Sequence, residues 1–380
     1  MQLFFDNYET LLAIFTGLYL LFMLFSVVGH IRLHVRQKKY VALTHFPTVS
    51  VLISCKNEED DLPTCLDSLA ALDYPEGKID FWIVDDRSTD RTAKVIQSFT
   101  LKNSNFHYLS TEDYDTHLEA KARGISFAAK HAKGEWLFIT DADAQVPSKW
   151  IKEMLKQVDD STGVIGGMLA VNDIGILGKL ERNTWGFTLP FAAAMSGWNK
   201  VFICVGPNMA IRRKAYENAG GLEAANFKIA EDLAIFQLAK QSGYQANFMA
   251  TKESTVELKP VPTFWHLFSQ LRRWLRGGFE ATFEYWIGLS LSLGVCFTMA
   301  SLLYIGLFTQ HPAFIKFFLL KCLGDSLLIL SEKLIIGKSR YIRYLPIIWM
   351  SNLFIFIWLP LSMLFSPRVH WKGKDYDIKY

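Results

Sequence analysis

Two carboxylates stand two residues apart, directly after a short apolar run. The run is Trp136 to Thr140, and the acids are Asp141 and Asp143. In an extended segment, residues two apart project to one face, so both carboxylates could share one Mg²⁺ or Mn²⁺ ion with phosphate oxygens. Such an ion would make a nucleoside diphosphate a better leaving group. Alone, this pattern more often marks turn chemistry after a strand, so its meaning depends on its neighbours.

Polar residues also follow two earlier apolar runs. Thr48–Cys55 is followed by Lys56-Asn57-Glu58-Glu59, and Ile79–Val84 by Asp85-Asp86-Arg87-Ser88-Thr89-Asp90. A carboxylate at such a position can accept a hydrogen bond from a base N–H or a ribose hydroxyl, while Ser88 or Asp90 caps the next helix. No glycine-rich phosphate loop follows either run, which argues against dinucleotide-binding and P-loop proteins.

The middle of the chain predicts an α/β fold. From about Thr44 to Lys259, short β-branched runs alternate with helical patterns, which is typical of a mostly parallel sheet covered by helices. The expected strands are Thr48–Cys55, Ile79–Val84, Phe106–Ser110 and Trp136–Thr140, and the expected helices are Asp61–Ala71, Asp90–Phe99 and Glu119–Ala132. Ligands in such sheets bind beyond the carboxyl ends of the strands, where the acidic residues fall.

The ends of the chain are apolar. Of the 380 residues, 51% are hydrophobic, which is high for a soluble enzyme. Tyr8 to Gly29 contains one charge and is long enough to cross about 30 Å of hydrocarbon as a helix. No signal-peptide cleavage site follows, and the basic residues come afterwards, in His30 to Lys39. We therefore expect an anchor with its N-terminus outside and the next segment in the cytoplasm.

Two further runs are expected in the bilayer, Trp286 to Phe308 and Leu345 to Phe365. Between them, Pro312 to Ile336 is apolar but carries charged residues, among them Lys316, Lys321, Asp325 and Glu332, so it either spans with a polar face or lies in the interface. Three C-terminal spans would place the basic tail outside, and two would place the basic cluster at 333–343 outside. Either breaks the positive-inside bias unless one segment is re-entrant; we expect a cytoplasmic tail.

Charge and cysteine content exclude some classes. The net charge of +3 is small and dispersed, so no nucleic-acid partner is expected. The five cysteines have no metal-ligand spacing and are expected to be reduced thiols; they are Cys55, Cys65, Cys204, Cys296 and Cys322.

Seven motifs occur in a fixed order. They are Lys56-Asn57-Glu58, Val84-Asp85-Asp86-Arg87-Ser88-Thr89-Asp90, Lys121-Ala122-Arg123-Gly124, Asp141-Ala142-Asp143, Gly206-Pro207-Asn208-Met209-Ala210, Glu231-Asp232 and Gln270-Leu271-Arg272-Arg273-Trp274. From Pro47 to Gly278 this set resembles the membrane-bound glycosyltransferases of family two. The tail Trp371 to Tyr376 also looks like the Trp-Lys-Gly-Arg-x-Tyr ending of such enzymes.

This resemblance implies a GT-A (nucleotide-diphospho-sugar transferase) domain flanked by transmembrane helices. It also implies a nucleotide-sugar donor, usually uridine-linked, with Mg²⁺ or Mn²⁺ as cofactor and inversion at the anomeric carbon. By position, the donor-binding residues are Glu58, Asp85, Asp86, Lys121, Asp141 and Arg273. Asp141 and Asp143 match the metal pair and Asp232 the general base, while the acceptor side comprises Asn208, Glu231, Gln270 and Trp274.

The chemistry of an inverting transfer supports Asp232 independently. One base must take the proton of the acceptor hydroxyl, and positive charge is needed on the side of the departing diphosphate. Asp232 precedes a helical pattern from Leu233 to Ser242, so its alternative role is a carboxylate favoured by the helix dipole. Many relatives have a further acid two residues on, where this chain has Ala234; this leaves the finer acceptor geometry open.

The last motif lies in an expected helix from Thr263 to Gly278. Phe264, Trp265, Phe268 and Arg276 suit an interfacial anchor. The resemblance places Arg273 at the diphosphate and Trp274 beneath the acceptor; a guanidinium suits a phosphate fork and an indole suits stacking on a sugar ring.

The motifs leave two reactions open. Gln-x-x-Arg-Trp occurs in processive synthases of chitin, hyaluronan or poly-GlcNAc type and in enzymes that add one sugar to a lipid, such as ceramide glucosyltransferases. Few expected spans leave little room for a polymer pore, so we favour transfer to a lipid or membrane-bound acceptor. A non-catalytic sugar-nucleotide-binding membrane protein is the third class; the presence of Asp232 and the Asp-x-Asp pair argues against it.

The expected organisation has four parts. They are an anchor with its basic segment (1–43), a cytoplasmic GT-A catalytic domain (44–262), an interfacial helix (263–284) and C-terminal membrane segments with a basic tail (285–380). We expect an integral protein of the bacterial inner (plasma) membrane, in contact with the lipid bilayer.

Overall fold

The computed structural model describes residues 2–172, 174–227, 230–277, 313–336, 344–350, 362, 368–371 and 374–377. The chain divides into two compact units. Unit 1 comprises Met1–Val35, Asp173–Phe202 and Pro260–Tyr380, and unit 2 comprises Arg36–Asn172 and Ile203–Lys259. The domain boundaries expected from sequence remain predictions. The structure adds that residues 173–202, which we had placed in the catalytic domain, cluster with the chain's two ends.

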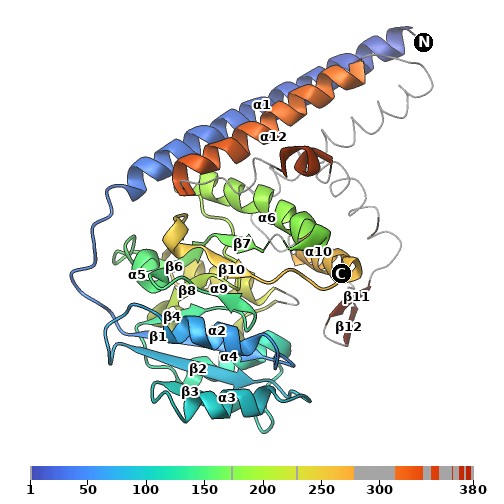
Figure 1. The fold of residues 1–380 in the computed structure, drawn as a ribbon. Helices are drawn as coiled ribbons and strands as arrows, with labels where there is room; N and C mark the ends of the chain where they lie inside the picture. The colour runs from blue at the N-terminus through green and yellow to red at the C-terminus, as the bar shows by residue number, and fades with distance from the viewer. Residues whose placement is uncertain are drawn as a thin grey trace. The chain divides into compact units, whose positions relative to one another are not determined.

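Unit 2 is built on a seven-stranded sheet of order β3-β2-β1-β4-β8-β6-β9 (Figure 1). The first four strands along the chain are mutually parallel: β1 (Val49–Cys55), β2 (Ile79–Asp85), β3 (Phe106–Ser110) and β4 (Trp136–Ile139). Strand β8 (Met209–Arg212) runs antiparallel to β4 and to β6 (Thr162–Gly167), and β9 (Gln245–Met249) is parallel to β6. The predicted α/β fold with a mostly parallel sheet is confirmed.

Helices and a small second sheet complete unit 2. The helices are α2 (Leu62–Ala70), α3 (Thr92–Thr100), α4 (Ala120–His131), α5 (Trp150–Leu155), α7 (Arg213–Asn218), α8 (Gly221–Ala224), α9 (Glu231–Gln241) and the short η1 (Lys252–Ser254). The small sheet contains β5 (Ala144–Gln145), β10 (Val256–Leu258) and β7 (Leu169–Val171).

The core of unit 2 lies at the centre of the large sheet. Leu52, Trp136 and Phe138 are fully buried because the central strands are covered on both faces. Helix α4 packs on β1 and β2, and this close approach requires Gly124, since a Cβ there would lie 2.2 Å from Ser54 Oγ. Helix α4, which begins at Ala120 and carries Lys121, is thus held against the sheet.

Unit 1 contains the long helices α1 (Gln2–Gln37), α6 (Gly175–Ser196), α10 (Phe264–Gly277) and α12 (Ala313–Ile336), and the two-stranded sheet of β11 (Arg368–Trp371) and β12 (Lys374–Asp377). Within the described residues, one helical stretch, Leu12–Gln37, is long and apolar enough to cross a membrane by length and composition. This agrees with the expected anchor and is weak support for it, because a buried core helix or a signal sequence has the same properties.

Helices α1 and α12 lie side by side (Figure 1). The Tyr19 hydroxyl of α1 donates to the Asp325 carboxylate of α12, which also binds Lys321. Of the charges that made Pro312–Ile336 ambiguous in the sequence, Asp325 therefore faces α1 and pairs with the buried Lys321, while Lys316 is exposed. The predicted run Trp286–Phe308 lies outside the described residues, as does most of Leu345–Phe365.

Candidate active site

The loops after β1 and β2 interlock at the predicted ligand edge. Asn57 Oδ1 accepts a hydrogen bond from Thr89 N at 2.8 Å, and Ser88 Oγ accepts one from Asn57 N at 3.0 Å. Glu58 N donates to Thr92 Oγ1 at 2.8 Å, and Asp85 Oδ1 accepts from Ser88 N at 3.3 Å. These backbone bonds fix where the predicted donor residues Glu58 and Asp85 leave the sheet.

Asp86, the other predicted donor residue, is fully engaged inside the unit. It is 1% exposed, and its carboxylate accepts hydrogen bonds from Arg123 Nε at 2.7 Å, Arg123 Nη2 at 3.0 Å and Thr111 Oγ1 at 2.7 Å. The structure therefore shows Asp86 joining β2 to α4, and its expected contact with the donor stays a prediction. Of the acidic pair, Asp85 remains the better predicted donor contact.

The buried Asp86–Arg123 pair makes a stability prediction. Arg123→Met should lower the free energy of unfolding by roughly 3–5 kcal/mol, because it leaves a buried carboxylate unpaired. Arg91→Met is the matched control: the Arg91–Glu59 pair is exposed at 78% and 29%, and such pairs contribute about 1 kcal/mol or less. Thermal unfolding of both variants measures this, and an equal loss in the two would contradict the prediction.

Lys121 brings three predicted residues together. It stands at the start of α4, its Nζ contacts the Asp141 carboxylate beyond β4, and it lies 3.3 Å from Glu231 Oε1 on α9. Burial alone would lower the pKa of Lys121, but Asp141 and Glu231 outweigh it and hold that pKa above its ordinary value. A permanently positive charge therefore lies on the acidic edge of the sheet.

Asp232 is held by backbone N–H groups at the start of α9. Its Oδ2 accepts from Gly206 N at 3.0 Å and its Oδ1 from Leu233 N at 2.8 Å. Burial, and then the neighbouring Glu231, raise the pKa of Asp232 to about 6, although Lys121 and the two N–H groups oppose this. A carboxylate with this pKa is ionised at neutral pH and is a better proton acceptor than an ordinary one.

Gly206 has a role that sequence reasoning did not assign. A Cβ at this position would lie 2.6 Å from Lys121 Nζ and 3.7 Å from Asp232 Cβ. Only glycine leaves Lys121 in place while donating its N–H to the predicted base. The sequence feature that could have indicated this role is the glycine that begins the fifth motif.

Asn208, predicted to contact the acceptor, is enclosed within unit 2. It is 0% exposed; its Nδ2 donates to Met168 O at 2.7 Å and Ser254 O at 2.8 Å, and its Oδ1 accepts from Trp150 Nε1 at 2.8 Å. Both amide hydrogens are used within unit 2. Asn208 therefore joins neighbouring segments, and its expected contact with the acceptor stays a prediction.

We expected Asp141 and Asp143 to lie in an extended segment, but in the structure they do not. The chain turns after β4, and Ala144 N donates to Asp141 O at 3.2 Å. Among the described residues, no three His, Cys, Asp or Glu side chains are grouped so as to hold a metal by themselves. The donor set still fits a hard divalent cation, because Mg²⁺ commonly takes one or two carboxylates and completes its shell with substrate phosphates and water. The ammonium against Asp141 shows that this position favours a cation.

The Gln-x-x-Arg-Trp motif lies in unit 1 on α10, as predicted. Burial raises the pKa of Glu181 on α6, and the nearby Gln270 side chain opposes this rise; the ring centroid of Trp274 lies 4.1 Å from that of Trp185. Glu181 Oε2 also accepts from Val261 N at 2.7 Å, just before α10. Glu181 and Trp185 were missed because neither belongs to a motif. Arg273 of the same motif is half-buried.

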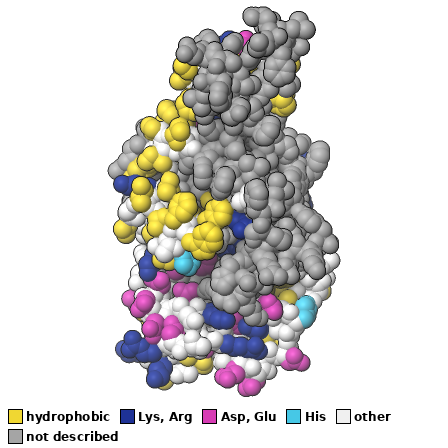
Figure 2. Space-filling model, turned by 90° about the vertical axis from the view of Figure 1, so that its right-hand side faces the viewer, with side chains coloured by type: hydrophobic (Ala, Val, Ile, Leu, Met, Phe, Trp, Pro, Cys, Tyr) yellow, Lys and Arg dark blue, Asp and Glu magenta, His cyan; other side chains and the backbone are white. Residues whose placement is uncertain are grey.

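Exposed apolar residues gather at the starts of two helices of unit 1. Phe264 and Trp265 of α10 are 56% and 68% exposed, and Ile174 and Ile176 at α6 are 74% and 76% exposed. Figure 2 shows hydrophobic side chains gathered on part of one face of the molecule. Exposed aromatic side chains suit an interfacial anchor, and this role of α10 stays a prediction; the side chain of Arg276 lies outside the described residues.

Four cysteines are described, Cys55, Cys65, Cys204 and Cys322; all four are buried, and none of them forms a disulfide.

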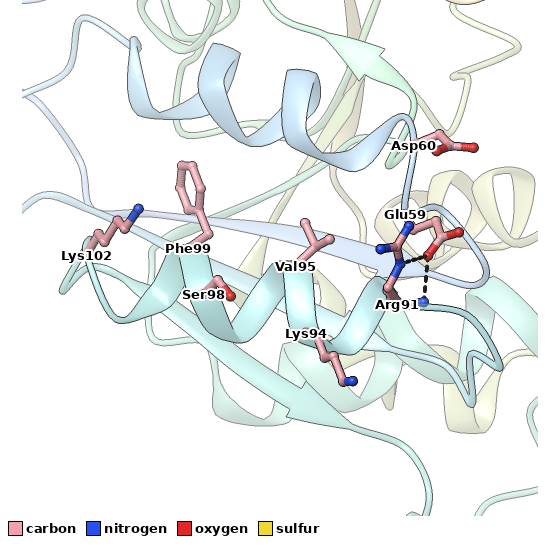
Figure 3. A pocket seen from close by; sticks show the side chains of 8 residues that line it. All are labelled: Glu59, Asp60, Arg91, Lys94, Val95, Ser98, Phe99 and Lys102. Atoms are coloured by element: carbon pink, nitrogen blue, oxygen red, sulfur yellow. Dashed lines mark hydrogen bonds and ion pairs between the residues drawn. The ribbon is translucent and has the colours of Figure 1, made fainter.

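A cavity elsewhere on unit 2 lies beside α3 (Figure 3). Its lining comprises Glu59, Asp60, Arg91, Lys94, Val95, Ser98, Phe99 and Lys102. It contains none of the predicted site residues, so we do not assign it to the reaction.

Comparison with known proteins decides the family. The model of glycosyl transferase family 21 matches residues 14–380. The chain belongs to glycosyl transferase family 21. The motifs had indicated a nucleotide-sugar glycosyltransferase of family two; the general class is confirmed, and the family that matches is family 21.

Curated relatives of this family 21 protein include lipid and polysaccharide enzymes. A β-monoglucosyldiacylglycerol synthase of Nostoc is 23% identical over 248 residues, which cover 63% of this chain and 51% of the relative. A poly-β-1,6-N-acetyl-D-glucosamine synthase of Staphylococcus epidermidis is 24% identical over 324 residues, covering 78% and 68%. The chain thus spans about half the length of the first of these relatives.

A solved structure with a similar fold is the mannosyltransferase of Pyrobaculum calidifontis in complex with GDP-Man and Mn²⁺. It covers 94% of this chain and 99% of its own, with a TM-score of 0.65 and 19% identity. At this identity the likeness establishes the fold alone, a GT-A glycosyltransferase fold for the family 21 chain.

Proposed function

We propose that this protein is an inverting glycosyltransferase that moves a sugar from a nucleotide-sugar donor to a hydroxyl of a lipid or membrane-associated acceptor. The observation that carries the proposal is the arrangement at the sheet edge. Asp232, with its pKa near 6, lies in the same cluster as Lys121, which contacts Asp141 and Glu231. This arrangement combines a proton acceptor with fixed positive charge, the two requirements of inverting transfer.

In the proposed reaction, Asp232 takes the proton of the acceptor hydroxyl as its oxygen attacks the anomeric carbon. The bond from that carbon to the diphosphate breaks, and Lys121 moves from Asp141 to the negative diphosphate. Gly206 N keeps Asp232 oriented through its 3.0 Å hydrogen bond. Asp85 and Glu58 contact the nucleoside, and Arg273 remains our proposed second cation for the diphosphate.

Asp141 and Asp143 would hold the divalent cation, Mg²⁺ or Mn²⁺. When bound, this ion neutralises charge on the departing diphosphate. The Mn²⁺ and GDP-Man named with the Pyrobaculum mannosyltransferase support a metal and a nucleotide-sugar donor. They leave open whether the nucleoside here is uridine, as the motifs suggest, or guanosine.

The acceptor proposal rests on unit 1 and on the lipid relatives. The diacylglycerol named for the Nostoc relative is a membrane lipid, and the exposed aromatic residues of α10 suit the lipid interface. The poly-N-acetylglucosamine relative supports the alternative, a processive synthase. We favour membrane association with single transfer, with Gln270 and Trp274 on the acceptor side.

Trp274→Ala tests the acceptor side. We expect acceptor use to fall by roughly tenfold or more while hydrolysis of the donor changes little, since an indole contributes stacking on a sugar or packing on a lipid. The assay offers radiolabelled nucleotide sugars to membranes and separates organic-extractable from water-soluble products. His266→Ala, at an exposed position of the same helix with no assigned role, is the matched control and should retain acceptor use. Long water-soluble polymer from the purified protein alone would favour the processive synthase.

A further inference from the structure

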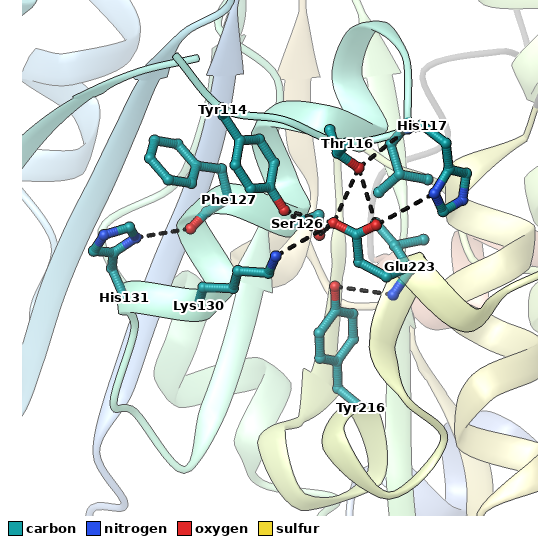
Figure 4. Close-up of polar contacts among 11 residues, drawn as sticks. Tyr114, Thr116, His117, Ser126, Phe127, Lys130, His131, Tyr216 and Glu223 are labelled. Carbon is teal, nitrogen blue, oxygen red and sulfur yellow. Dashed lines mark hydrogen bonds and ion pairs between the residues drawn. The ribbon is translucent and has the colours of Figure 1, made fainter. Parts of the chain in front are cut away.

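Glu223 of α8 gathers polar groups from the segment between β3 and α4 (Figure 4). Its Oε1 accepts from Tyr114 Oη at 2.6 Å, and Thr116 Oγ1 lies 3.0 and 2.9 Å from its two oxygens. His117 Nδ1 lies 3.5 Å from Oε2. From α4 itself, Lys130 Nζ approaches to 3.4 Å and Ser126 Oγ to 3.5 Å.

The chain turns sharply to present Glu223 to this segment. Gly220 and Gly221 both adopt left-handed conformations, with φ of 80° and 64°. A Cβ on Gly221 would lie 2.8 Å from the Tyr216 ring, whose hydroxyl accepts from Leu222 N at 3.1 Å. The two glycines and Tyr216 therefore hold α8 in a defined place.

The two segments joined at Glu223 also meet at the candidate active site. Thr116 and His117 lie a few residues before Lys121 in the sequence. Glu223 lies in the segment before Glu231. Lys121 Nζ lies 3.3 Å from Glu231 Oε1. The two segments are thus in contact at two places, once between Lys121 and Glu231 and once at Glu223.

Ala120, which lies between these two contacts in the sequence, has a strained backbone. Ala120 has φ of 48°, a left-handed conformation that is unfavourable for a residue with a Cβ. Such a conformation persists only where the surrounding structure holds it. The hydrogen bonds to Glu223 hold the segment that leads into Ala120, and so they affect where the Lys121 side chain starts.

The hydroxyl groups of Tyr114 and Thr116 contribute most to holding this segment on Glu223. His117 and Lys130 are exposed at 66% and 53%, and exposed ion pairs contribute little. Partial burial would raise the pKa of Glu223, but hydrogen bonds from Tyr114, Thr116 and Lys130 outweigh it, so this pKa lies below its ordinary value. Glu223 is therefore ionised and accepts several hydrogen bonds at neutral pH.

We infer that Glu223 is a positioning residue that acts through Lys121 to set the affinity for the nucleoside diphosphate part of the donor. This inference rests on the proposed function, in which Lys121 contacts the diphosphate. It predicts an energetic coupling between two residues that do not touch. A purely structural Glu223 would stabilise unit 2 without such a coupling.

The experiment is a double-mutant cycle on the full-length protein in detergent, with UDP and GDP as probes and Mn²⁺ present. The variants are Glu223→Gln, Lys121→Met and the double variant, and titration calorimetry gives each dissociation constant. We expect Glu223→Gln to weaken binding roughly fivefold or more with Lys121 present and less than about twofold with Met at 121. Thr116→Val should weaken binding in the same direction with a smaller effect, and it replaces Glu223→Gln if that variant does not fold.

Glu217→Gln is the control. Glu217 lies on α7, next to α8 in the chain, pairs with Arg213 at 3.0 Å and is 56% exposed, so binding should not change. Equal weakening in both Lys121 backgrounds, or unchanged affinity in Glu223→Gln, would overturn the inference. Failure of the unmodified protein to bind either nucleotide would instead refute the proposed function.

Discussion

Replacing Asp232 with Asn should reduce kcat by roughly 10²-fold or more, because the variant cannot take the acceptor proton in the transition state. Donor affinity should change little, since a base acts mainly after the donor is bound. The Asn side chain is close in size to Asp, and its one amide oxygen can still accept the hydrogen bond from Gly206 N, although the bond from Leu233 N is then lost. Turnover and nucleotide binding, measured separately on one preparation, test this.

The same residue sets an expected pH dependence. Burial and Glu231 raise the pKa of Asp232 to about 6, so Asp232 is protonated, and inactive as a base, below that pH. The rate of the unmodified protein should therefore rise with pH through a midpoint near 6 and then level off. Asp232→Asn should lose this dependence. A variant that retained the same acid limb, or lost donor affinity as strongly as turnover, would show that Asp232 is not the base.

Loss of the metal should abolish transfer. Asp141→Asn and Asp143→Asn should each leave almost no activity, because both carboxylates of the turn after β4 are needed to hold a cation against the diphosphate. Treatment with EDTA should give the same result, and adding Mg²⁺ or Mn²⁺ should restore the rate in the unmodified protein only.

Asp73→Asn is a suitable control for this experiment. Asp73 is 57% exposed and pairs with Lys152 at 2.6 Å, so its loss should leave activity unchanged. Full activity in chelator would contradict the metal requirement, and the positive charge would then come from Lys121 and Arg273 alone.

The sequence by itself determined much of the local structure and named the candidate site residues. The strand Phe106–Ser110 matches β3 at both ends, and the expected strand Thr48–Cys55 differs from β1 by one residue. Side-chain periodicity and the turn residues between elements depend on neighbours in the chain, so they can be interpreted without knowing the fold. The resemblance assigned Lys121 and Asp141 to the donor and Glu231 to the acceptor side, and the structure brings these three side chains together.

Only the tertiary structure decided which members of each motif are available to a ligand. Asp85 and Asp86 are chemically identical in the sequence, yet Arg123 occupies both oxygens of Asp86. Asn208 is used entirely within unit 2, and Glu181, Trp185 and Glu223 acquire their roles from partners far away in the chain. Such pairings depend on strand order and helix packing, which bring together residues that no local pattern connects.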